Sequence, residues 1–159
     1  MRRIVVSGTI CGKASDLFEW SQNTERRSEW DPFVSKIQWL EGETGPRVGA
    51  AARVHSKDGV SIVARRVSFQ PARRTEFVME EGPAFLRALS GEWTFSQIDA
   101  CACRVAFVYS FAVRPRALRE LVEPWAAWWL RRRTQARWNA FKTWAQTRAA
   151  AQKIKEAAR

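Results

Sequence analysis

The stretch Arg104-Val105-Ala106-Phe107-Val108-Tyr109-Ser110-Phe111-Ala112-Val113 decides the fold. Bulky side chains recur at every second position of this stretch, from Val105 to Val113, and the residues between them are mostly small. Alternation with a period of two predicts a β-strand with one bulky aromatic face. A sheet that contains such a strand has to pack this face against something large.

The segment that follows predicts the partner of this face. From Arg116 onwards the composition turns to good helix formers and Trp, which predicts a helix of about forty residues, ending near Ala150 with residues 152–159 frayed. Apolar residues form two helical faces: Leu118, Leu121, Val122, Trp125 and Trp129 share the first, and Leu130, Thr134, Trp138, Phe141 and Ala145 share the second. Pro124 lies near the change of face and predicts a short helical lead-in followed by a break or bend.

Six more strands and two short helices account for the rest of the chain. Residues 4–10 are rich in β-branched side chains and predict the first strand. Ser15 and Thr24 are candidate caps of two successive short helices, of which the second ends before Asp31-Pro32. The remaining strands are expected at residues 33–40, 50–56, 61–69, 75–80 and 91–98. We find no internal repeat and expect one α+β domain over residues 1–159.

The positive charge is concentrated in the C-terminal segment. The 27 Lys and Arg against 16 Asp and Glu give a net charge of +11, which favours a polyanionic partner. Residues 1–112 hold 15 basic and 13 acidic side chains, whereas residues 113–159 hold 12 basic and 3 acidic ones. We therefore interpret the charge as a property of the exterior of the long helix.

Cysteine usage and hydropathy predict a cytoplasmic protein. Cys11, Cys101 and Cys103 are odd in number and indicate reduced thiols rather than a disulfide framework. The N-terminal apolar stretch is short and interrupted, and the run from Trp125 to Leu130 falls far short of the ~20 residues that span a bilayer.

Six segments in this order resemble the START/Bet v 1-like (SRPBCC) superfamily, and in particular its bacterial polyketide cyclase/dehydrase-like members. The segments are residues 8–18, 25–33, 47–50, 67–74, 91–95 and 104–111. The resemblance covers about residues 3 to 145 and implies a helix-grip fold, in which a curved antiparallel sheet of about seven strands surrounds the C-terminal helix. It also implies an apolar cavity that binds lipids, sterols or polyketides, while some members of the superfamily are cyclases or dehydratases.

The leading functional hypothesis is therefore the binding of a small hydrophobic molecule. Twelve residues are candidates for the wall of its cavity: Trp30, Phe33, Phe77, Met79, Phe85, Leu89, Trp93, Phe95, Phe107, Tyr109, Phe111 and Trp125. The same aromatic residues also fit a filled core, and the two interpretations stay open.

Two further functions stay open as alternatives. An aromatase/cyclase-like or dehydratase-like enzyme would use Tyr109, His55 or Arg53 to polarise a carbonyl group and move protons. A module that contacts a membrane or nucleic acid would use Arg131, Arg132 and Arg133, which follow a group of tryptophans. No specific nucleic-acid signature is present, a weak contact with an anionic surface and a homodimer stay open, and we expect neither a cofactor nor a metal.

Overall fold

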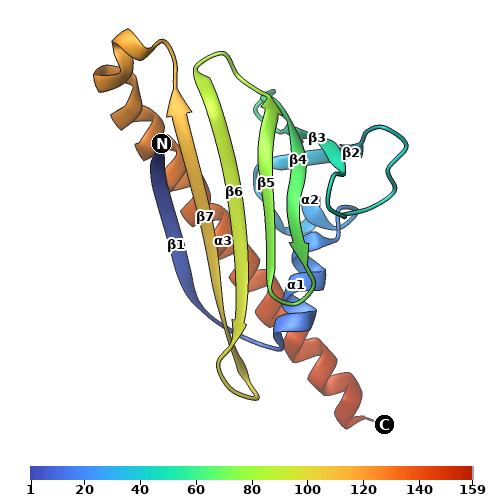
Figure 1. Ribbon diagram of the computed structural model, residues 1–159. Helices are drawn as coiled ribbons and strands as arrows, with labels where there is room; N and C mark the ends of the chain where they lie inside the picture. Colours follow the sequence, from blue (N-terminus) through green and yellow to red (C-terminus); the bar gives the residue numbers. More distant parts are fainter. Residues whose placement is uncertain (159) are drawn as a thin grey trace.

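The structure, a computed structural model that describes residues 1–158, contains one antiparallel seven-stranded sheet with a long helix lying diagonally across it (Figure 1). The strands are β1 (Arg2–Cys11), β2 (Val34–Trp39), β3 (Ala51–Ser56), β4 (Ser61–Gln70), β5 (Arg74–Glu81), β6 (Leu86–Gln97) and β7 (Ala102–Val113). The helices are α1 (Ala14–Gln22), α2 (Arg27–Trp30), the 3-10 turn η1 (Arg116–Leu118) and α3 (Arg119–Ala157). The strand order β1-β7-β6-β5-β4-β3-β2 is that of a helix-grip fold, so the predicted fold class is confirmed.

The aromatic face of β7 packs against α3, as its alternation predicts. Phe107 and Phe111 are fully buried, and the Phe107 ring lies 6.0 Å from the ring of Phe141 on α3. The indole Nε1 of Trp138 donates a hydrogen bond of 3.4 Å to the carbonyl oxygen of Val105. The second predicted helix face, from Leu130 to Ala145, is therefore the face that α3 buries.

Three local predictions were wrong. β6 begins at Leu86 instead of residue 91, because its first residues continue the ladder with the end of β7 and pair Leu89 with Phe111. Neither Ser15 nor Thr24 caps a helix: α2 begins only at Arg27, and the N–H group of Ala14, which opens α1, donates to Oε1 of Gln97 at 2.7 Å.

The long helix also differs from its prediction. α3 continues through Pro124 without a break, because the missing hydrogen bond falls on the exposed first turns of the helix, where water can satisfy the carbonyl group left free. Leu121 and Trp125, from the first predicted face, are 77% and 51% exposed. The helix runs to Ala157, so the expected fraying from residue 152 is not observed, and Arg159 lies outside the described residues. None of the described helices is long and apolar enough to cross a bilayer.

Close packing of α3 on β1 depends on a glycine. A Cβ atom added to Gly8 would lie 2.6 Å from two ring carbons of Trp138, closer than such atoms approach in proteins. The indole therefore rests directly on the backbone of β1, which fixes the distance between the sheet and this part of the helix.

We expect the substitution Gly8→Ala to lower the free energy of unfolding by about 1–3 kcal/mol, because the added methyl group overpacks the contact with Trp138. Gly45→Ala is the matched control, since nothing lies within 4 Å of a Cβ atom at that position. Urea unfolding followed by far-UV circular dichroism measures both variants. Equal stability of the two variants would contradict the close contact.

Candidate ligand cavity

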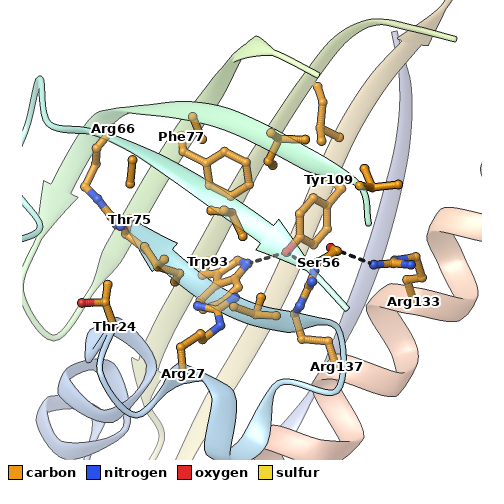
Figure 2. A pocket seen from close by; sticks show the side chains of 18 of the residues that line it. Thr24, Arg27, Ser56, Arg66, Thr75, Phe77, Trp93, Tyr109, Arg133 and Arg137 are labelled. Atoms are coloured by element: carbon orange, nitrogen blue, oxygen red, sulfur yellow. Dashed lines mark hydrogen bonds between the residues drawn. The ribbon is translucent and has the colours of Figure 1, made fainter. Parts of the chain in front are cut away.

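A cavity of about 170 Å³, partly open to solvent, lies between the middle of α3 and the sheet (Figure 2). It forms because α3 packs on β1 and β7 and makes little contact with strands β2 to β5. The inward positions of β3 and β4 carry small residues, Ala52 and Ala64, which leave space that larger side chains would fill. Most of the remaining wall is apolar and includes Val54, Ile62 and Leu89.

Three aromatic residues, Phe77, Trp93 and Tyr109, form the part of the wall that lies on β5, β6 and β7. Phe77 of β5, Gly91 of β6 and Tyr109 of β7 lie side by side in the ladder, and a Cβ atom on Gly91 would come within 2.4 Å of the Phe77 ring. The glycine thus lets the rings of Phe77 and Tyr109 meet edge to face at 6.1 Å. Trp93, the next inward residue of β6, stacks on Phe107 at 4.3 Å.

A buried ion cluster joins this wall to the helices. The Asp31 side chain, which directly follows α2, is fully buried, and its Oδ2 accepts hydrogen bonds from Nε of Arg27 at 2.8 Å and from Nε of Arg137 at 2.7 Å. Its Oδ1 accepts a hydrogen bond of 3.1 Å from the N–H group of Phe33. Nη1 of Arg137 donates to the phenol oxygen of Tyr109 at 3.0 Å, and Nε1 of Trp93 donates to the same oxygen at 3.2 Å.

The cluster holds Asp31 in its charged form. Burial alone would raise the pKa of this carboxyl group, but the charges of Arg137 and Arg27 and the hydrogen bonds from Phe33 and Arg27 outweigh burial. The pKa of Asp31 therefore lies well below its ordinary value. A carboxyl group whose pKa is lower in the folded than in the unfolded chain stabilises the fold above the unfolded pKa and loses this effect as the pH falls.

We expect Asp31→Asn to lower the free energy of unfolding at pH 7 by about 3–5 kcal/mol, because it leaves two buried guanidinium groups without their carboxylate. The difference from the wild type should shrink as the pH falls below about 4, where the unfolded chain binds a proton at Asp31 and the folded chain does not. Urea unfolding between pH 7 and pH 3 measures this difference in the free energy of unfolding. Glu25→Gln is the control, because Glu25 is exposed. A difference that does not vary with pH would show that the charge of Asp31 is not what stabilises the fold.

Two more arginines line the cavity from other elements. Arg66 of β4 donates through Nη1 to Oε1 of Gln22 at 2.7 Å and to the hydroxyl oxygen of Thr75. Burial, and then repulsion by Arg27, lower the pKa of Arg66 to about 10, so it stays charged at neutral pH. Arg133 of α3 bonds to Asp58 and donates to the hydroxyl oxygen of Ser56 at 3.3 Å (Figure 2).

The three predicted catalytic candidates lie on different faces of the sheet. Tyr109 lines the cavity and is only 4% exposed. Arg53 and His55 do not line it, because they alternate in β3 with Val54 and Ser56, which do. Arg53 bonds instead to Glu81, and Nδ1 of His55 lies 3.0 Å from the hydroxyl oxygen of Ser61.

The twelve aromatic and apolar candidates divide into three groups. Four line the cavity: Phe77, Leu89, Trp93 and Tyr109. Four are buried in the filled core and do not line the cavity: Trp30, Phe95, Phe107 and Phe111. The last four neither line the cavity nor are fully buried: Phe33, Met79, Phe85 and Trp125. Trp125 is the most exposed of them, and its ring packs on the rings of Phe85 and Trp129.

The polar part of the cavity was not predicted from the sequence. Its charged residues are Arg27, Arg66, Arg133 and Arg137, with Asp31 behind them. A signal for Arg137 was present, since this residue lies three positions after Thr134 and four before Phe141, on the face that α3 buries. Arg131 and Arg132 are exposed, whereas the Arg133 side chain is 15% exposed and lies over the rings of Phe33 and Trp129.

No cluster of metal-binding side chains accompanies the arginines within residues 1–158. Cys11 and Cys101 are exposed, and Cys103 is buried in β7. All three are free thiols.

Comparison with known proteins identifies the family. Residues 1–146 match the family described as polyketide cyclase/dehydrase and lipid transport, and the chain belongs to this family. A search of curated proteins finds no match.

Solved structures show the same fold at low sequence identity. The ZhuI aromatase/cyclase from Streptomyces sp. R1128 aligns with a TM-score of 0.77 at 21% identity, over 93% of this chain and 95% of that one. The di-domain aromatase/cyclase StfQ of the steffimycin biosynthetic pathway aligns with a TM-score of 0.73 at 18% identity, over 93% of this chain and 51% of that one. A START superfamily protein from Mycobacterium smegmatis aligns with a TM-score of 0.67 at 10% identity, over 84% and 92% of the two chains.

Proposed function

We propose that the chain binds a small, largely apolar molecule in the cavity between α3 and the sheet. The observation that carries this proposal is the cavity itself, whose wall is mostly apolar with a few polar groups at defined positions. The family to which the chain belongs is described as polyketide cyclase/dehydrase and lipid transport, which supports a bound ligand of this kind.

The size of the cavity limits the ligand. An empty apolar cavity of about 150 Å³ holds a benzene molecule, so the 170 Å³ here suits one ring or two small ones. Sites for drug-sized ligands measure roughly 300–1,000 Å³, so a longer molecule would extend through the open side into solvent. We therefore propose a compact aromatic or alicyclic body as the part of the ligand that is enclosed.

Filling the cavity should prevent binding of a neutral probe. We expect the wild type to bind N-phenylnaphthylamine with an increase in its fluorescence and a dissociation constant on the order of 10–100 μM. Ala64→Phe should weaken this binding at least about tenfold, because the new ring occupies the space beside Ile62 and Phe77.

Val67→Phe is the matched control for this experiment. Val67 lies on the same strand but is 44% exposed and does not line the cavity, so its substitution should leave binding unchanged. Far-UV circular dichroism and thermal unfolding check that both variants fold. Saturable binding that survives Ala64→Phe would exclude this cavity as the binding site.

One observation favours a second function, the catalysis of a cyclase- or dehydratase-type reaction. Both hydrogen bonds of the Tyr109 oxygen come from donors, Nε1 of Trp93 and Nη1 of Arg137, and no residue among 1–158 accepts the phenol proton. That proton is free to bond to a carbonyl oxygen of a ligand in the cavity, and the two donors would stabilise negative charge on the phenol oxygen.

For this second function we expect Tyr109→Phe to reduce turnover of a poly-β-ketone substrate at least about 100-fold, because the proton donor is lost. Binding of N-phenylnaphthylamine should change little, since the ring of residue 109 keeps its place against Phe77. His55→Ala serves as the comparison, because His55 does not line the cavity. The rate of product formation is measured by chromatography for each variant. An unchanged rate in Tyr109→Phe would rule out Tyr109 as the proton donor.

A further inference from the structure

The cavity carries more positive charge than the carboxylates around it balance. Four guanidinium groups line it, from Arg27, Arg66, Arg133 and Arg137, and no Asp or Glu is among its lining residues in the described chain. Asp31 pairs with Arg27 and Arg137, and Asp58 pairs with Arg133. Four positive and two negative charges leave a net charge of two positive at this site.

Arg66 is the arginine whose charge is not compensated. Among residues 1–158 no carboxylate lies within ion-pair distance of it, although its neighbour Arg65, on the other face of β4, bonds to Glu41 and Glu80. Only Nη1 of Arg66 is engaged, by the neutral groups of Gln22 and Thr75, which leaves Nε and Nη2 without an acceptor there. Besides burial, the like charge of Arg27 lowers the pKa of Arg66.

A carboxylate bound at Arg66 would lower this net charge from two positive to one. Like charges held in a partly enclosed, mostly apolar site repel each other more strongly than in water, because the surroundings screen them less. A planar carboxylate matches the planar fork of a guanidinium and can accept two of its N–H groups at once. The Phe77 ring and the aliphatic side chains of β3 and β4 are available for the rest of such a molecule (Figure 2).

We propose that the cavity selects compact apolar molecules that carry a carboxylate, and that Arg66 binds this carboxylate. The proposal rests on the proposed function and names the class of its ligand. Gln22 and Thr75 hold the Arg66 guanidinium in place, so the group is positioned before the ligand arrives. The charge of Arg133 is already compensated by Asp58, and Arg133 also donates to Ser56, so it contributes less.

Two probes with the same bicyclic body test the proposal. Naphthoate carries a carboxylate at neutral pH, and naphthalenemethanol carries a neutral hydroxymethyl group in its place. We expect isothermal titration calorimetry to show that the wild type binds naphthoate at least about tenfold more tightly than naphthalenemethanol. In Arg66→Gln the affinity for naphthoate should fall about 10- to 100-fold, whereas that for naphthalenemethanol should stay within about threefold.

Two further variants separate the cavity from the surface charge of the chain. Arg66→Lys keeps the positive charge and should keep most of the preference for naphthoate. Arg104→Gln removes one charge from an exposed position of β7 that forms no ion pair among the described residues, and should change neither affinity. A loss of naphthoate binding in Arg104→Gln equal to that in Arg66→Gln would show general attraction to a basic surface and overturn the proposal.

The outcomes also distinguish this proposal from the proposed function. Equal affinity of the wild type for both probes would overturn the selection of carboxylates and leave a neutral ligand in the same cavity. Failure of naphthoate, naphthalenemethanol and N-phenylnaphthylamine alike to bind would overturn the proposed function itself. The comparison of the two naphthalene probes is made on the wild type. It therefore tests the selection of carboxylates even if Arg66→Gln does not fold.

Discussion

The carboxylate of Asp31 lies between the guanidinium groups of Arg27 and Arg137, and the geometry of the cavity depends on this contact. It joins the end of α2 to the middle of α3, 106 residues further along the chain, and Arg137 extends the connection to Tyr109 on the sheet. Each group of the cluster would be costly to bury alone, so the three stay buried only together. The cluster therefore holds the end of α2, the middle of α3 and β7 together beside the cavity.

One molecule has both a filled core and a cavity because α3 packs closely on only part of the sheet. On the side of β1 and β7, Gly8 lets Trp138 rest on the backbone and Phe107 meets Phe141, so no space is left. On the side of β3 and β4, the small side chains of Ala52 and Ala64 line the cavity, and this space stays open. The same helix face thus packs against rings at one end and presents guanidinium groups at the other.

The sequence predicts the fold well, because the fold depends on periodic patterns. The alternation from Val105 to Val113 and the second apolar face of the long helix each identify a buried surface on one element. The charged part of the cavity depends on side chains from α2, β4 and α3 that meet only in the folded chain. In the sequence, no local pattern distinguishes Arg66, which lines the cavity, from its neighbour Arg65, which does not. Because the sequence analysis assigned the C-terminal charge to the helix exterior, it did not identify Arg133 and Arg137 as cavity residues.

The choice of arginine over lysine at these positions has a physical reason. The chain has 21 Arg and 6 Lys, and all four cations that line the cavity are arginines. Arg137 directs Nε at Asp31 and Nη1 at Tyr109, so one planar group satisfies a carboxylate and a phenol in different directions and still retains a further amino group. A lysine ammonium is a compact, strongly hydrated charge that could not bridge both partners in this geometry and would lose more on burial. Guanidinium groups can therefore serve as structural links and as part of the cavity wall at once, which is how a domain of this size can keep positive charge beside an apolar site.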